Sequence, residues 1–122
     1  MYTASEDCYS RGIVRHAGKT GLMLPPISLG LWKKFGSQDP FYDRRKVILH
    51  AFDKGILQFD NANHYGDGDF GSSEKLFGQI LNNELKPYRD ELVISTKVGY
   101  EIHDDPYGIG TSRKSLIQGI ND

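Results

Sequence analysis

Three short apolar runs divide this chain at regular intervals. They lie at residues 27–32, 56–59 and 92–98, and they are rich in leucine, isoleucine, valine and phenylalanine. Runs of this length, bounded by polar or glycine-containing segments, are typical of buried strands. We therefore predict three core strands, the second of which ends at Asp60.

Apolar residues spaced three or four positions apart fill the gaps between the runs, which predicts helices. The predicted helices cover residues 43–54, residues 72–86 and the segment from 112 onward. Asp43, Ser72 or Ser73, and Ser112 are the predicted capping residues. Pro87 cannot continue the second helix. Strands that alternate with helices predict an α/β fold with parallel strands and right-handed crossovers.

The N-terminal segment has a different pattern. Residues 1–8 lack an apolar run and are predicted to be a loose terminus. Residues 12–15 and 22–24 are predicted to pair as a hairpin through a turn at 17–21, which contains two glycines. The prolines at 25–26 end the hairpin because neither can donate a ladder hydrogen bond.

Parallel strands bring their carboxyl ends to one edge of a sheet, where α/β folds keep their chemistry. Asp60 lies at such an end, Tyr65 follows five residues later, and Lys97 interrupts an apolar strand. A buried ammonium is costly unless it is paired, and Asp60 is the expected counter-ion. A nearby cation favours the anion of a phenol, so Tyr65 could act as a general acid. The alternative is a structural ion pair with Tyr65 capping a loop.

Other candidates each have two readings. Trp32, at the end of the first strand, could pack on a flat ligand or cover the end of the sheet. Residues 66–71 match G-x-G-x-x-G, a pattern of dinucleotide-binding turns, but Asp67 and Asp69 would repel a pyrophosphate, which favours glycines that only shape a loop. Residues 113–114, Arg-Lys, could bind a phosphate or form a solvated first helical turn.

Composition narrows the function classes. The 122 residues carry a formal net charge of -1, which gives no reason to expect nucleic acid as a partner. One cysteine, Cys8, cannot form an internal disulfide and indicates a reducing compartment. No apolar run is long enough for membrane insertion and no signal peptide is evident, so we expect a cytoplasmic protein. The four histidines have no metal-ligand spacing, so we expect no metal and predict that each faces solvent or bonds locally.

Three separated motifs identify a family. Residues 29–32 (LGLW), 59–66 (FDNANHYG) and 94–97 (ISTK) occur in order and resemble the aldo-keto reductases. Residues 88–92 and 108–114 look most like the bacterial L-glyceraldehyde 3-phosphate reductase branch, which is also similar to the β-subunits of voltage-gated potassium channels.

This resemblance implies a (β/α)8 TIM barrel closed at its bottom by the N-terminal hairpin. It implies NADPH-dependent reduction of an aldehyde or ketone, a small-molecule carbonyl substrate and no metal. Tyr65 would be the catalytic proton donor, Lys97 would make it a stronger acid, and Asp60 would pair with Lys97. Trp32 and Asp60 would lie near the nicotinamide. The related branch also suggests a homo-oligomer.

A complete barrel takes about 250 residues. We therefore interpret residues 1–122 as a single domain fragment, the N-terminal portion with the first three βα units, in which the barrel is incomplete. The family's fourth catalytic residue, a histidine, and its main site for the cofactor phosphate would follow later. We expect the chain alone to bind NADPH weakly and to turn over little. Two alternatives stay open: a cofactor-sensing subunit of the channel-regulating kind, and a small Rossmann-like nucleotide binder that uses the 66–71 glycines.

Overall fold

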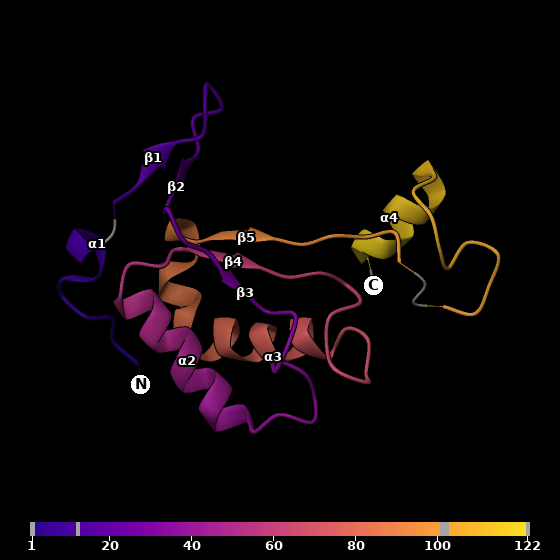
Figure 1. Ribbon diagram of the computed structural model, residues 1–122, viewed down its shortest axis with the longest axis horizontal. Coiled ribbons are helices and arrows are strands. Elements are labelled where there is room, and N and C mark those ends of the chain that lie inside the picture. The colour runs from indigo at the N-terminus through magenta and orange to yellow at the C-terminus, as the bar shows by residue number, and fades with distance from the viewer. Residues whose placement is uncertain (1, 12, 101–102, 122) are drawn as a thin grey trace.

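A computed structural model describes residues 2–11, 13–100 and 103–121. Its main sheet contains β3 (Leu29–Gly30), β4 (Gln58–Asp60) and β5 (Val93–Ser95), all parallel and in that order (Figure 1). The predicted strand order and direction are confirmed. In the register, Gly30 lies opposite Asp60, and Asp60 lies opposite Ser95. The carboxyl ends of the three predicted strands therefore lie side by side at one end of the sheet.

Each strand is shorter than its apolar run, so the prediction of a strand over 92–98 is wrong in extent. Lys97 lies two residues beyond the end of β5. Single backbone hydrogen bonds continue past the regular ladder, from Asn61 N to Ser95 O at 2.8 Å and from Asn63 N to Lys97 O at 3.0 Å. These bonds hold the segments after β4 and β5 side by side without making them regular strands.

The helices occupy the predicted segments but begin at different residues. The first is α2 (Phe41–Asp53), which starts two residues before Asp43 and leaves that carboxylate in the first turn. Next comes α3 (Ser72–Ile80), whose N-cap is Gly71, so neither predicted serine caps it. The last is α4 (Arg113–Asn121), and here the prediction is confirmed, because Ser112 Oγ accepts a hydrogen bond from Ser115 N at 3.1 Å.

Helical structure continues past α3 without a break. The π-helix η1 (Leu81–Leu85) is followed by the 3₁₀-helix η2 (Lys86–Glu91), in which Pro87 lies at the start. An early position suits proline because its missing N–H needs no partner there. Residues 89–90 are therefore helical.

The core lies between the sheet and the helices α2 and α3, which lie on one side of it (Figure 1). Phe59, fully buried, points to this side, and its ring lies 5.1 Å from that of Phe77 on α3. Because neighbouring residues of a strand face opposite ways, Gln58 and Asp60 then point to the other face. Among the described residues, the core cluster contains eleven buried hydrophobic side chains: Leu31, Phe35, Ile48, Leu49, Phe52, Phe59, Leu76, Phe77, Ile80, Leu85 and Leu92.

The N-terminus is tied down, which contradicts the prediction of a loose segment. Tyr2 Oη and Ser5 N both donate to Asp53 Oδ1 on α2, at 2.7 and 2.8 Å. The helix α1 (Cys8–Arg11) follows, and Cys8 is buried with 1% of its surface exposed.

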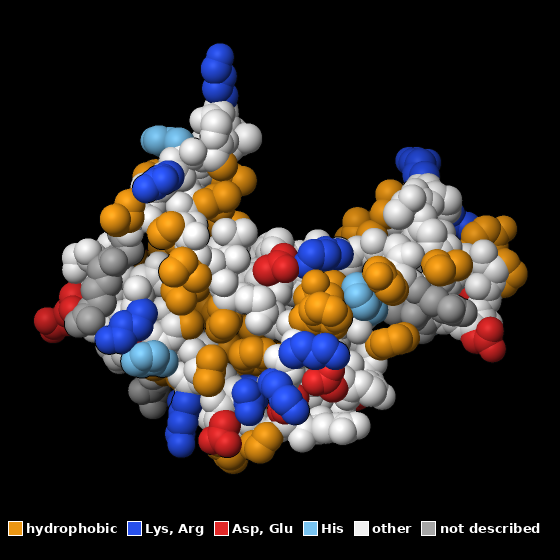
Figure 2. Space-filling view, viewed as in Figure 1, with side chains coloured by type: hydrophobic (Ala, Val, Ile, Leu, Met, Phe, Trp, Pro, Cys, Tyr) orange, Lys and Arg blue, Asp and Glu red, His pale blue; other side chains and the backbone are white. Residues whose placement is uncertain are grey.

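The predicted hairpin is confirmed in β1 (Arg15–His16) and β2 (Met23–Leu24), which pair antiparallel across the expected turn. The hairpin extends away from the parallel sheet (Figure 1). Hydrophobic side chains gather over this part of the molecule in Figure 2. Those with large exposed surfaces include Ile13, Leu22, Met23 and Ile27. The three parallel strands of the described chain form an open sheet, not a closed barrel. Within the same residues, no helix is both long and apolar enough to cross a membrane.

Candidate active site

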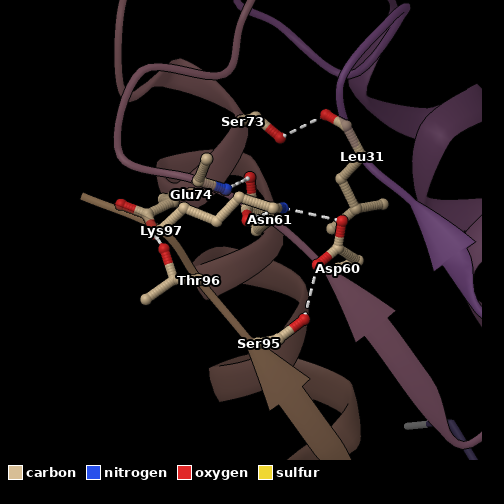
Figure 3. Close-up of polar contacts among 9 residues, drawn as sticks. Leu31, Asp60, Asn61, Ser73, Glu74, Ser95, Thr96 and Lys97 are labelled. Carbon is tan, nitrogen blue, oxygen red and sulfur yellow. Dashed lines mark hydrogen bonds and ion pairs between the residues drawn. The ribbon is translucent and has the colours of Figure 1, made fainter. Parts of the chain in front are cut away.

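An ion pair lies at the carboxyl ends of the three parallel strands. Lys97 Nζ lies 2.7 Å from Asp60 Oδ2 and donates a second hydrogen bond to the Asn61 carbonyl oxygen at 2.9 Å. Ser95 Oγ donates to the other carboxylate oxygen of Asp60 at 2.6 Å. Figure 3 shows the lysine and the serine reaching Asp60 from one segment, which leaves β5. The predicted pairing of Lys97 with Asp60 is present.

The surroundings of Lys97 differ from the prediction of a buried ammonium. Its side chain is 46% exposed and that of Asp60 is 35% exposed. Lys97 lies two residues beyond the end of β5. The carboxylate is therefore accessible enough to meet a ligand and still has two protein donors.

The pKa values follow from these contacts. Burial favours the protonated form of Asp60, but the hydrogen bonds from Lys97 and Ser95 outweigh this effect and lower its pKa below the usual value. Burial likewise favours the neutral amine of Lys97, yet hydrogen bonds with Asp60 and Tyr65 raise its pKa. Both groups are thus held in their charged forms near neutral pH.

Tyr65 lies in the loop after β4 and meets the same ammonium. Lys97 Nζ is 4.7 Å from the centroid of the Tyr65 ring, and the nearby phenol is one of the groups that raise the pKa of Lys97. The amide of Tyr65 donates to Ala62 O at 3.0 Å, which closes a turn directly after the strand. That turn brings the phenol back over the strand end. The predicted convergence of Asp60, Tyr65 and Lys97 is therefore seen in the structure.

Trp32, two residues beyond the end of β3, completes the group. Its ring stacks on that of Tyr65, with centroids 6.1 Å apart and planes 25° apart, and 57% of its surface is exposed. The exposed indole and the phenol together form a flat aromatic surface beside the ion pair. A planar ring with a polar substituent fits such a surface.

Two members of this site were missed in the sequence. Ser95 precedes Lys97 by two residues, so both lie on the same side of the extended segment, and this spacing could have indicated it. The Asn61 carbonyl gave no sequence signal because any residue carries one.

His64 also contradicts its prediction, since it neither faces solvent freely nor bonds locally through Nδ1. Its ring stacks on Tyr100 at 4.0 Å between centroids and meets Tyr65 edge-on at 5.0 Å. The Nδ1 atom is buried without a hydrogen-bond partner. Burial, and then the charge of Lys97, lower the pKa of His64. The neutral ring thus packs beside the aromatic surface formed by Trp32 and Tyr65.

The glycines at 66–71 shape the loop, as expected. Gly66 has a φ of 126°, and a Cβ there would lie 2.0 Å from Ser72 Oγ and 2.6 Å from Asp69 O. The Arg-Lys pair at 113–114 belongs to α4, which lies beyond the carboxyl ends of the strands (Figure 1), and Lys114 Nζ is 3.3 Å from the Tyr107 ring centroid. Among residues 2–11, 13–100 and 103–121, no group of three or more His, Cys, Asp or Glu side chains is arranged to hold a metal ion.

Comparison with known proteins decides the family. The model of the aldo/keto reductase family matches residues 26–122. The chain belongs to the aldo/keto reductase family. It is 44% identical over 121 residues to L-glyceraldehyde 3-phosphate reductase of Escherichia coli strain K12, which covers 99% of this chain and 35% of that protein. A Schizosaccharomyces pombe protein named as a voltage-gated potassium channel subunit beta is 37% identical over 109 residues. The match covers 88% of this chain and 30% of that protein.

Solved structures agree with this aldo/keto reductase assignment. A Pseudomonas aeruginosa protein described as an aldo-keto reductase matches with a TM-score of 0.69 and 30% identity, covering 89% of this chain and 40% of that one. A thermostable aldo-keto reductase has a TM-score of 0.66 at 24% identity, which supports the fold alone. The predicted fold class is confirmed: an α/β arrangement shared with this TIM-barrel family, open in the described residues. The chain spans about a third of the length of the curated relatives above.

Proposed function

We propose that this chain supplies the proton-donating part of an NADPH-dependent reductase that converts an aldehyde or ketone to an alcohol. One observation carries the proposal: Tyr65, Lys97 and Asp60 come from separate segments and meet at one strand edge. Membership of the aldo/keto reductase family supports the same reaction type. We propose further that residues 1–122 are the first three βα units of the barrel.

In this proposal Tyr65 donates its phenolic proton to the carbonyl oxygen. The charge of Lys97, 4.7 Å from the ring centroid, stabilises the phenolate that remains, and solvent later returns the proton. Asp60 keeps Lys97 charged and aimed, since it accepts a 2.7 Å hydrogen bond from Nζ. NADPH, when bound, supplies the hydride that the carbonyl carbon accepts.

Trp32 and Asp60 are the residues that we assign to cofactor binding. The exposed face of Trp32 offers an apolar surface for a flat ring, and Asp60 offers a carboxylate oxygen within the same edge. Since the Escherichia coli relative is named for L-glyceraldehyde 3-phosphate, a small phosphorylated aldehyde is the first substrate to test. We also propose that the protein is cytoplasmic and forms a homo-oligomer.

The test is NADPH oxidation by the polypeptide that the gene encodes, with glyceraldehyde and L-glyceraldehyde 3-phosphate as probes. Tyr65→Phe removes the proton donor and keeps the ring, so kcat should fall by about 10²- to 10⁴-fold. Tyr42→Phe, at a tyrosine that is 75% exposed on α2, should leave kcat unchanged. If Tyr65→Phe retains nearly all the activity, the proposal is wrong. The 122-residue chain alone should bind NADPH weakly and turn over little.

A second candidate is a cofactor-sensing subunit, which the 37% identity to a potassium channel subunit beta favours. Such a protein would bind NADPH but hardly consume it with any carbonyl probe. Tight NADPH binding by the wild type, together with negligible turnover of both probes, would select this alternative over the reductase.

A further inference from the structure

The Trp32–Tyr65 pair lies between two loops, and packing alone does not hold it. Trp32 is 57% exposed, so its ring has few neighbours to fix it. Trp32 lies in the loop after β3, two residues beyond the end of that strand, and the loop at residues 66–71 begins directly after Tyr65. A contact that joins these two loops would therefore fix the relative orientation of the two rings.

Asp67 joins them with both carboxylate oxygens. Lys33 Nζ lies 3.2 Å from Oδ1, and the backbone N–H of Lys34 donates to Oδ2 at 3.3 Å. Lys33 Nζ is also 5.1 Å from the centroid of the Trp32 ring, so one ammonium touches both the carboxylate and the indole. The carboxylate is thus connected to both rings, through Lys33 to Trp32 and through the backbone to Tyr65.

The backbone of the two loops is shaped for this contact. Lys34 has a φ of 66°, a left-handed conformation that non-glycine residues rarely adopt, and its N–H is the one that meets Asp67. A Cβ on Gly36 would lie 2.7 Å from Asp67 N, so only glycine allows the loops to approach this closely. A strained residue and a required glycine at one contact indicate that the contact is specific.

The charge of Asp67 fits the same role. The backbone hydrogen bond from Lys34, followed by the hydrogen bond from Lys33, lowers the pKa of the carboxyl group. The carboxylate therefore stays ionised throughout the neutral range.

We propose that Asp67 is a positioning residue: its carboxylate fixes the loop after β3 to the loop after β4 and thereby holds Trp32 in place against Tyr65. The catalytic consequence rests on the proposed reductase function, whereas the structural consequence does not.

The first test is the fluorescence anisotropy of Trp32, which is the single tryptophan of this chain. Asp67→Asn should free the indole and roughly halve the anisotropy that persists beyond the first nanosecond, the time range of loop motion. Asp69→Asn, which removes an exposed carboxylate of the same loop, is the matched control and should change nothing. Circular dichroism of each variant shows whether the chain keeps its helices. Unchanged anisotropy in a folded Asp67→Asn variant overturns the proposal.

The second test is turnover in the polypeptide that the gene encodes. Because a small misplacement of a reacting group is costly, Asp67→Asn should lower kcat about tenfold, and Asp67→Glu should restore part of the loss. If the anisotropy falls but kcat is unchanged, the positioning role is wrong. If instead Tyr65→Phe is fully active, the proposed function fails, and the anisotropy result still decides whether Asp67 holds the two loops together.

Discussion

Asp60 lies at the carboxyl end of β4, and its charged side chain connects β4 to the neighbouring strand. Its carboxylate accepts hydrogen bonds from Ser95 and Lys97, and both donors belong to the segment that includes and follows β5. The ionised form of Asp60 therefore links β4 to β5 through side chains as well as through the backbone. Protonation would weaken both links at once.

This arrangement predicts how stability depends on pH. The pKa of Asp60 is lower in the folded protein than its ordinary value of 3.8, so folding favours the ionised form. Its contribution is present above the ordinary pKa and is lost as the pH falls through the lower, folded pKa. Between pH 5 and pH 3, urea unfolding should show a smaller loss of unfolding free energy for Asp60→Asn than for the wild type.

The control for this prediction is Asp69→Asn, at an exposed carboxylate in the loop before α3. It should lose stability with falling pH just as the wild type does. Equal acid sensitivity of Asp60→Asn and the wild type would show that the ion pair does not contribute.

At the scale of elements, the contact of β4 with α3 depends on Phe59. This side chain is fully buried, and its ring lies 5.1 Å from that of Phe77. Truncating a buried phenylalanine leaves a cavity and removes apolar contacts, so Phe59→Ala should lower the free energy of unfolding by about 3–5 kcal/mol. Phe70→Ala, at a phenylalanine that is 59% exposed, should cost far less in the same urea titration. Similar losses for the two variants would contradict this description of the core.

The positions of strands and helices could be predicted from the sequence where one face of the element is buried. The apolar runs located β3, β4 and β5, and helical spacing located α2 and α3, because each signal comes from one buried face. Helix starts were less predictable: α2 begins at Phe41 without a side-chain cap, and Gly71 precedes α3 in a left-handed conformation with a φ of 80°. Local capping preferences give way here to the packing of each helix on the sheet.

For the molecule as a whole, topology explains why the site could be predicted. Parallel strands in the order β3-β4-β5 bring Trp32, Asp60 and Lys97 to one edge regardless of side-chain detail. His64 and Asp67 could not be found in this way, because their positions depend on the paths of two loops. The anchoring of the N-terminus through Asp53 was likewise invisible in the sequence, since it joins residues about fifty positions apart.

Apolar side chains near the hairpin are exposed, and the parallel sheet is open. Ile13, Leu22 and Met23 are 67%, 51% and 47% exposed, and hydrophobic side chains gather over this region in Figure 2. Three parallel strands leave edges without partners, and the barrel of this family covers such edges by closing. The strand edge that carries Tyr65 is nevertheless already assembled in these residues.

The central claim is that Tyr65 and Lys97 act as one unit in carbonyl reduction. A double-mutant cycle of kcat/KM tests it most directly, with Tyr65→Phe, Lys97→Met and the combined variant in the polypeptide that the gene encodes. Groups that act together are strongly non-additive, so the double variant should be no slower than Tyr65→Phe alone, within about threefold. If the two losses multiply instead, the phenol and the ammonium act independently, and the mechanism proposed for this strand edge is wrong.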